Sequence, residues 1–235
     1  MDEQSNSPDL FLFLASTVHD MKNSISVLSG TLEGLLADAS AKTESAYPDM
    51  AQMLYQTKRL NDNLIHLLAL YKQVGTADYP ADIAPHEVVQ LVDQVAGASR
   101  VLLQSKNIEL VTEFDPDLIW HFDEDLIIGV IGNAINNAIR YTGDRIRLAI
   151  FENEGYLEVR IEDNGRGYPG AMLEAGASAM SGARGGVNFM TNSTGLGLHF
   201  SSEVAKMHRH RTRSGSLRLE NGGAYGGGCF VLRLP

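Results

Sequence analysis

Apolar residues recur at helical spacing along the first third of the chain and predict two amphipathic helices. In the first helix they follow alternating steps of three and four, which is the spacing of a heptad seam. These residues are Phe11, Leu14, Val18, Met21, Ile25, Leu28, Leu32 and Leu35. The second seam consists of Met53, Thr57, Leu60, Leu64, Leu67, Tyr71 and Val74. Small and polar residues and a proline interrupt the pattern between residues 40 and 48, so the two helices are expected to form a hairpin.

Each seam needs an apolar surface against it, and two amphipathic helices alone form a thin core. Pairing with a second copy of the chain into a four-helix bundle would bury both seams, so we expect a homodimer. An intramolecular helical partner is the alternative.

The pattern changes after residue 76. Residues 77–85 contain two prolines and several small residues and predict a linker. Helices are then expected at 86–105, 123–142 and about 195–208, and strands at 108–114, 118–122, 145–151, 156–162, 216–220 and 229–234. This mixture predicts an α+β fold for residues 86–235, in which helices and a sheet form two layers. The expected domains are therefore a helical hairpin at 1–76, a linker at 77–85 and a layered domain at 86–235.

Composition narrows the function classes. A formal net charge of −10 argues against a general nucleic-acid binder, because such proteins neutralise phosphates with an excess of basic residues. No stretch approaches the roughly 20 apolar residues that a membrane-spanning helix needs. The single cysteine, Cys229, cannot form an internal disulfide and fits a reducing compartment. We therefore expect a soluble, cytoplasmic protein.

A row of polar residues lies within the helix expected at 123–142. Asn133, Asn137 and Arg140 follow one another at steps of four and three, so they share one helix face. A solvated face is the alternative, but such faces usually carry Glu and Lys rather than Asn, which is a poor helix former. Asparagine oxygens can bind Mg²⁺ and arginine can bind phosphate, so this face is a candidate ligand site.

Two glycine motifs are further candidates for a ligand-binding site. Asp163, Gly165 and Gly167 follow an expected strand, where a tight turn lets the backbone approach a ligand and a carboxylate can accept a hydrogen bond from an amine. The second motif, Gly195-Leu196-Gly197, opens an expected helix, whose free N-terminal amides favour phosphate. Each motif alone is also compatible with an ordinary turn.

The first helix carries a histidine beside an acidic residue. His19 lies one step beyond the seam residue Val18 and should face outward, and Asn23 lies four residues further on the same face. An exposed histidine is usually only a surface residue. Imidazole is nevertheless a good nucleophile near neutral pH when a carboxylate such as Asp20 takes its proton.

Together and in this order, the four clusters resemble the conserved boxes of the histidine kinases of bacterial two-component systems. Residues 19–23 resemble the H box, 133–142 the N box, 163–167 the G1 box and 195–198 the G2 box. The last ten residues, 226–235, are also similar to the final strand of that family. The resemblance implies a dimerisation and phosphotransfer hairpin followed by an ATP-binding domain of the Bergerat (GHKL) type.

The resemblance also implies a role for each matched residue. His19 would accept the γ-phosphoryl group of ATP with Asp20 as its base, and Asn23 would orient a water for dephosphorylating the partner. The implied nucleotide-binding residues are Asn133, Asn137, Arg140, Tyr141, Asp163, Gly165, Gly167, Gly195, Leu196 and Gly197. Among them, Asn137 would be the main Mg²⁺ ligand with Asn133 assisting, and Asp163 would bind the adenine amino group.

The implied partner is the receiver domain of a response regulator, which would take the phosphoryl group on an aspartate. Only 18 residues precede His19. We therefore expect a separate sensory input protein, unless the chain is part of a longer one. The main rival is an inert phosphotransfer or scaffold protein, which would be expected to lose residues of the N or G1 box. An ATPase or serine kinase of the same fold would lack a hairpin with a His-Asp pair.

Overall fold

The computed structural model describes residues 81–173 and 196–235, together with helical residues in short runs between 21 and 36 and between 50 and 60. The chain divides into two compact units, Met1–Asp78 and Tyr79–Pro235. The predicted site residues His19, Asp20, Asn23 and Gly195 lie outside the described residues. Among the residues that are described, no helix has both the length and the apolarity needed to cross a membrane.

In the first unit, every described residue is helical, as the two seams predict. Leu36 and Leu54 are buried, whereas several seam residues are at least half exposed. The described seam residues with these exposed side chains are Met21, Leu28, Leu35, Met53 and Leu60. The described residues do not include the connection between the two helices, so the hairpin and its pairing stay predictions.

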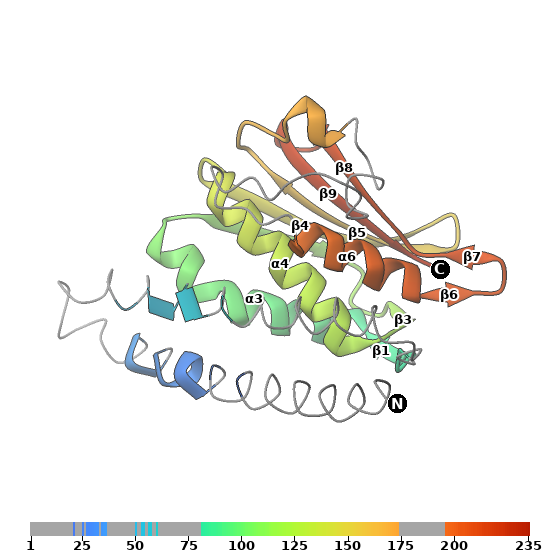
Figure 1. Ribbon diagram of the computed structural model, residues 1–235, viewed down its shortest axis with the longest axis horizontal. Coiled ribbons are helices and arrows are strands. Elements are labelled where there is room, and N and C mark those ends of the chain that lie inside the picture. Colours follow the sequence, from blue (N-terminus) through green and yellow to red (C-terminus); the bar gives the residue numbers. More distant parts are fainter. Residues whose placement is uncertain are drawn as a thin grey trace, which may run out of the picture. The chain divides into compact units, whose positions relative to one another are not determined.

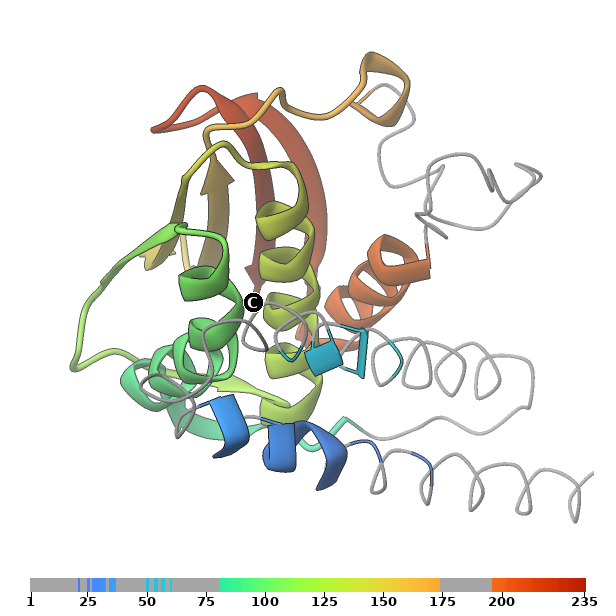
Figure 2. The ribbon, with the colours of Figure 1, turned by 90° about the vertical axis from the view of Figure 1, so that its left-hand side faces the viewer.

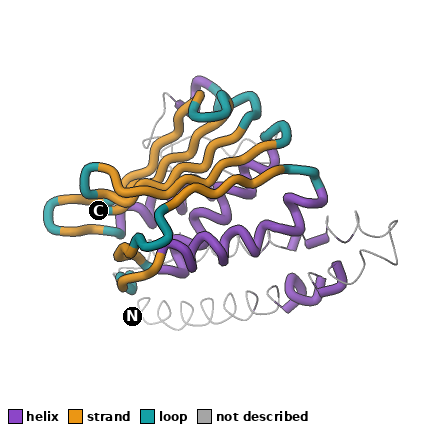
Figure 3. The backbone as a smooth tube through the Cα atoms, turned by 180° about the vertical axis from the view of Figure 1, so that it is seen from behind, coloured by secondary structure: helices purple, strands orange, loops and turns teal. Residues whose placement is uncertain are grey.

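The second unit is built on a five-stranded sheet with the strand order β2-β4-β5-β9-β8. These strands are β2 (Glu109–Phe114), β4 (Arg145–Asn153), β5 (Tyr156–Asp163), β8 (Ser216–Gly222) and β9 (Gly227–Leu234). β2 is parallel to β4, and the other neighbours are antiparallel. Three helices, α3 (Val88–Ser105), α4 (Glu124–Tyr141) and α6 (Leu196–Met207), cover one face of the sheet (Figures 1 and 3). The predicted two-layer α+β fold of this unit is therefore confirmed.

Two small sheets complete the described strands. β1 (Ala84–Glu87) pairs with β3 (Ile119–Phe122), and β6 (Arg209–His210) pairs with β7 (Arg213–Ser214). The sequence pattern predicts β3 but neither β1 nor the β6–β7 hairpin. The strands of the β6–β7 hairpin have two residues each, which is too short for alternation of apolar and polar residues to reveal them.

The core lies between the sheet and the helices. Alternate strand residues face the helix layer because side chains on a strand point to opposite faces in turn. The helix-facing set includes Ile146, Leu148, Ile150, Leu157, Val159, Ile161, Phe230, Leu232 and Leu234, all of which are buried. α4 is the central helix and packs against both α3 and α6 (Figure 2). By the same alternation Asp163, the last residue of β5, faces the helix layer.

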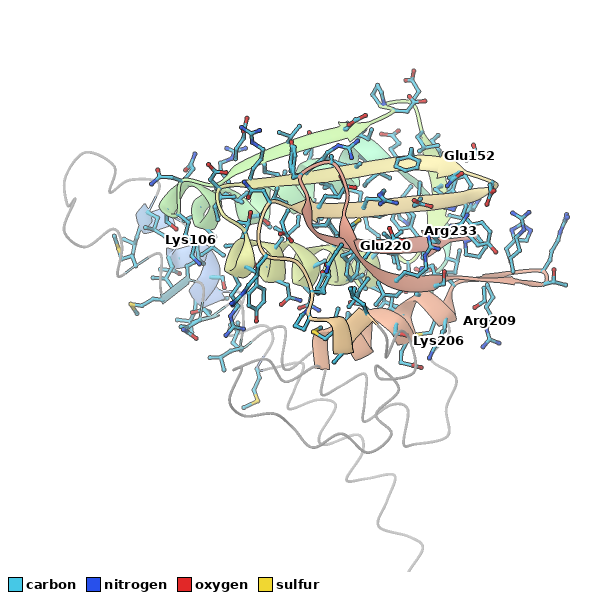
Figure 4. The ribbon with its side chains drawn as sticks, turned by 90° about the horizontal axis from the view of Figure 1, so that it is seen from above. Lys106, Glu152, Lys206, Arg209, Glu220 and Arg233 are labelled. Carbon is cyan, nitrogen blue, oxygen red and sulfur yellow. The ribbon has the colours of Figure 1, made fainter. Side chains whose placement is uncertain are left out.

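The opposite face of the sheet carries a network of ion pairs. Glu162 binds Arg147 Nη1 at 2.6 Å and Arg160 Nε at 3.1 Å, and Glu158 binds Arg160 Nη1 at 3.0 Å. Arg160 also pairs with Glu220 of β8, and Arg233 of β9 lies on the same face (Figure 4). Burial would raise the pKa of Glu162, but the hydrogen bonds from the two arginines outweigh it and leave that pKa below its ordinary value.

Cys229 lies within this network and is fully buried. Its Sγ atom is 3.2 Å from Arg160 Nη2. Burial is the main cause that raises the pKa of the thiol to about 12, so the sulfur stays protonated near neutral pH.

The basic run at residues 208–213 is exposed except at its first residue. His208 is 2% exposed, and its Nδ1 lies 2.8 Å from the carbonyl oxygen of Val204. Because a carbonyl can only accept, Nδ1 carries the proton and Nε2 accepts a hydrogen bond from the Asp123 backbone N–H at 3.1 Å. Only the following β6–β7 hairpin is exposed, and it extends past the end of α6 beside Lys206 and Arg209 (Figures 1 and 4).

Candidate functional site

α4 begins and ends within one residue of the predicted bounds, because its ends carry the charges and the cap that a helix needs. Asp123 caps the helix, and its Oδ1 accepts a hydrogen bond from the Leu126 N–H at 3.1 Å. Glu124 and Asp125 lie in the first turn and Arg140 lies in the last, which suits the helix dipole at both ends. The helix thus holds its predicted polar face in a fixed orientation.

This polar face borders the core. Asn133 is 9% exposed, and Asn137 and Arg140 are half-buried. Tyr141 is 40% exposed, and the Arg140 guanidinium lies 5.8 Å from its ring centroid. The face is therefore not the fully solvated one that the alternative interpretation required.

Asn133 meets the start of α6. A Cβ atom placed on Gly197 would collide with the Asn133 amide, so only glycine fits at this contact. Within the described part of the chain, Asn133 Nδ2 has no hydrogen-bond partner although the atom is buried. A buried amide without a partner is costly unless a ligand or ion completes its hydrogen bonding. The arrangement fits a polar ligand between α4 and the first turn of α6.

Asp163 is 7% exposed and is held by two backbone amides. Its Oδ1 accepts hydrogen bonds from the Gly165 N–H at 2.7 Å and from the Gly228 N–H at 3.2 Å. Neither bond uses Oδ2, and no other described residue donates to that atom. A buried carboxylate with one oxygen engaged can still accept a hydrogen bond from a ligand amine.

The turn after Asp163 touches the end of α4. A Cβ atom on Gly165 would collide with the Tyr141 carbonyl oxygen, so glycine is required at this position too. Asn164 fixes the same junction from outside: its Oδ1 accepts hydrogen bonds from the N–H groups of Gly143, Asp144 and Arg145 and from the Thr142 hydroxyl, at 2.8 to 3.2 Å. One side chain therefore joins the α4–β4 turn to the Asp163 turn.

The structure thus brings together three of the four predicted clusters. Gly197 lies against Asn133, and Gly165 lies against the Tyr141 backbone. Gly167 adopts a φ of 75°, which favours glycine. Leu196 is the first residue of α6. The fourth cluster, residues 19–23, and Gly195 cannot be placed, because they lie outside the described residues.

The donor set around this site fits a nucleotide and its metal. Asn133 and Asn137 offer amide oxygens, which Mg²⁺ accepts as ligands, and Arg140 offers a guanidinium for phosphate. The unpartnered atom is the Nδ2 donor of Asn133, and this favours an acceptor such as a phosphate oxygen.

Sequence reasoning missed several residues that shape the site. Asn164 stands inside a recognised motif, and its preference for turns was a usable signal. Gly228 and Asn221 come from the β8–β9 hairpin, more than 50 residues away, and nothing local in the sequence connects them to Asp163. Tyr168 packs over Gly228, and burial, together with the charge of Asp163, raises the pKa of its phenol.

Comparisons with known proteins agree with this geometry. Residues 122–235 match the family described as histidine kinase-, DNA gyrase B-, and HSP90-like ATPase. The phosphate regulon sensor protein PhoR of Pseudomonas aeruginosa is 25% identical over 207 residues, which cover 87% of this chain and 46% of PhoR. The sensor-like histidine kinase SenX3 of Mycolicibacterium smegmatis is 25% identical over 225 residues, which cover 95% of this chain and 56% of SenX3.

The fold is also that of a solved kinase domain. The catalytic domain of histidine kinase ThkA superimposes with a TM-score of 0.54 at 22% identity, over 66% of this chain and 95% of that domain. Residues 122–235 of the second unit are therefore similar to the ATPase domains of the histidine kinase-, DNA gyrase B- and HSP90-like family. More particularly, the named relatives and the matched domain support the ATP-binding core of a two-component sensor kinase. The chain spans about half the length of the curated relatives named above.

Proposed function

We propose that this chain is an autophosphorylating protein histidine kinase, which transfers the γ-phosphoryl group of ATP to His19 and then to an aspartate of a response regulator. The observation that supports this most is the meeting of three clusters along α4: Gly197 lies against Asn133, Gly165 lies against Tyr141, and Asp163 lies beside Gly165. An inert scaffold would be expected to lose residues of the N or G1 box, whereas this chain keeps Asn133, Asn137 and Asp163.

On the nucleotide side, Asp163 binds the adenine amino group through Oδ2, the oxygen that the Gly165 and Gly228 amides leave available. Arg140 and Tyr141 contact the nucleotide near the end of α4. Gly195, Leu196 and Gly197 present backbone amides to the phosphates at the start of α6. Asn137, assisted by Asn133, holds Mg²⁺, which offsets the negative charge of the triphosphate.

At the phosphoacceptor, an imidazole nitrogen of His19 attacks the γ-phosphorus, and the bond from that phosphorus to the bridging oxygen breaks to release ADP. Asp20 takes the imidazole proton. Phosphoryl transfer depends mainly on position and charge, so these residues need to align the reactants rather than form further covalent bonds. Asn23 orients a water that dephosphorylates the response regulator, and Asn23→Ala should therefore leave autophosphorylation intact.

The chain acts as a homodimer. Exposed apolar side chains in the first unit support the dimer, because Met21, Leu28 and Leu35 repeat at heptad spacing, as do Met53 and Leu60. A second copy would cover both rows.

A phosphorylation assay tests the nucleotide part of the proposal. The full chain is incubated with γ-labelled ATP, with and without Mg²⁺, beside Asn137→Ala and the matched control Asn153→Ala. Asn153 binds Glu158 at the remote end of β5, away from the proposed site. We expect Mg²⁺-dependent label in the wild type and the control and a loss of more than about tenfold in Asn137→Ala. Binding of ATP without any label in the wild type would favour the inert scaffold.

A further inference from the structure

Asn221, near the end of β8, holds the turn that follows Asp163. Its Oδ1 accepts a hydrogen bond from the Tyr168 N–H at 2.7 Å, and its Nδ2 donates to the Tyr168 carbonyl oxygen at 2.9 Å. The Asn221 amide thus binds both the backbone N–H and the backbone carbonyl of Tyr168, which is 53 positions away in the sequence. Two such hydrogen bonds fix the orientation of the Tyr168 backbone as well as its distance from β8.

The contact is close enough to require a glycine beside it. A Cβ atom on Gly167 would lie 2.7 Å from Asn221 Oδ1 and 2.8 Å from its Cγ. Gly167 also has a φ of 75°, which disfavours a larger residue, and an added Cβ would displace the Asn221 amide from Tyr168. The second glycine of the Asp-x-Gly-x-Gly motif is therefore explained by Asn221 without any ligand.

The residue paired with Asn221 in the sheet contacts Asp163, at the other end of the turn. Asn221 of β8 is paired with Gly228 of β9, and the Gly228 N–H donates to Asp163 Oδ1 at 3.2 Å. A Cβ atom on Gly228 would lie 2.8 Å from Asp163 Oδ2 and 3.2 Å from the Tyr168 ring. One pair of residues thus contacts the first and the last residue of the turn 163–168.

We infer that Asn221 is a positioning residue for nucleotide binding: by fixing Tyr168 and Gly167, it sets the position of the turn that presents Asp163 to the adenine. Asn221 touches the turn and acts through it, so it is not a catalytic residue. This inference rests on the proposed function, because it assigns Asn221 to the base-binding side of the same site.

The inference predicts a change in affinity with little change in turnover. Because Asn221 acts at the base-binding turn, its loss should weaken ADP and ATP by the same factor. Because no proposed phosphate or Mg²⁺ contact involves it, the rate at saturating ATP should stay nearly the same. Asn221 is exposed, so its replacement opens no cavity in the core.

The experiment compares Asn221→Ala and Asn221→Asp with the wild-type full chain and with Asn153→Ala as the matched control. Asn221→Asp keeps the shape of the side chain but replaces the donor to the Tyr168 carbonyl by an acceptor. Because this variant is isosteric, it tests the effect of the lost hydrogen bond without a change in packing. Calorimetric titration gives Kd for ADP and for a non-hydrolysable ATP analogue, and labelled ATP gives KM and kcat.

We expect both Asn221 variants to bind ADP and the ATP analogue about tenfold more weakly, with kcat within about twofold of the wild type and Asn153→Ala unchanged. Unchanged affinity in both variants would overturn the inference, as would a fall in kcat at unchanged Kd. A wild-type chain that binds neither nucleotide would overturn the proposed function and the inference with it. Weak binding confined to Asn221 variants leaves the proposed function standing and supports the inference.

Discussion

The Gly228 N–H donates a hydrogen bond to Asp163 Oδ1 at 3.2 Å, although the two residues are 65 positions apart in the sequence. The Gly165 N–H donates to the same oxygen. Two backbone amides thus orient one buried carboxylate at the end of β5, where the alternation of the strand turns it toward the helix layer. This orientation is what makes Asp163 suitable for binding a ligand amine.

Asp163→Asn should therefore weaken ATP binding. The asparagine keeps the shape of the side chain, but it loses the negative charge and turns an acceptor into a donor. We expect affinity for ADP to fall about 30-fold, since a hydrogen bond to a charged group contributes about 2 kcal/mol. Asp115→Asn, in the loop between β2 and β3, is the control and should bind as the wild type does. Equal affinities for the wild type and Asp163→Asn would refute the assignment.

Gly197→Ala should disturb the contact between α6 and α4. The added Cβ collides with the Asn133 amide, and we expect a loss of about 1–3 kcal/mol in the free energy of unfolding together with weaker nucleotide binding. Gly97→Ala is the control, because its Cβ would meet nothing within 4 Å in α3. That variant should gain about 0.5–1 kcal/mol and bind normally. Denaturant unfolding and ADP titration measure both effects, and a Gly197→Ala variant with wild-type affinity would contradict the site.

Asn164→Ala should loosen the junction between α4 and β4. It removes the acceptor for three backbone N–H groups, which water then solvates at this exposed turn. We expect a loss of about 1–2 kcal/mol in the free energy of unfolding. Asn164→Asp keeps the acceptor but brings a second carboxylate next to Asp144. Its free energy of unfolding should therefore lie between those of the wild type and Asn164→Ala. An alanine variant as stable as the wild type would show that the junction holds without this side chain.

His208 should make the stability of the second unit depend on pH. Burial lowers its pKa, and the Val204 carbonyl and the Asp123 carboxylate offset this only in part. Below its unfolded pKa of about 6.5, the unfolded chain binds more protons than the folded chain. The free energy of unfolding therefore decreases as the pH falls through that value, by at most about 1.4 kcal/mol for each pH unit.

Urea unfolding of the wild type, His208→Gln and His210→Gln at several pH values measures this effect. His208→Gln should lose the part of the pH dependence that begins near 6.5, and His210→Gln is the exposed control. The same pH dependence in His208→Gln as in the wild type would contradict the role of the buried imidazole.

Much of the second unit could be predicted from the sequence because its pattern is local. α4 has an N-terminal cap, acidic residues in its first turn and a continuous apolar face, and its predicted bounds differ from the observed ones by one residue at each end. The strands of the five-stranded sheet either alternate apolar and polar residues or, as in β9, form a short apolar run, and they were predicted within a few residues. The glycines at 165 and 197 were found because each stands in a recognisable motif.

The remaining features depend on tertiary contacts that no local pattern encodes. His208 follows a helix and precedes a run of arginines, so the sequence favours a solvated end, yet its ring accepts a hydrogen bond from Asp123 on another element. Asn221 lies in a glycine-rich hairpin, and its contact with Tyr168 depends on the pairing of β8 with β9. Charged residues on a strand usually face solvent, but on this sheet Glu158 and Glu162 are buried because they form ion pairs with arginines of the same face.

Autophosphorylation of His19 is the central claim, and one assay tests it most directly. The wild-type chain, His19→Gln and His66→Gln are incubated with γ-labelled ATP and Mg²⁺, and the label is treated with acid and with base. His66 is the matched control because it lies in the second predicted helix of the same hairpin. We predict an acid-labile, base-stable label in the wild type and in His66→Gln and none in His19→Gln. Label that persists in His19→Gln, or a wild-type chain that binds ATP and stays unlabelled, would contradict the account.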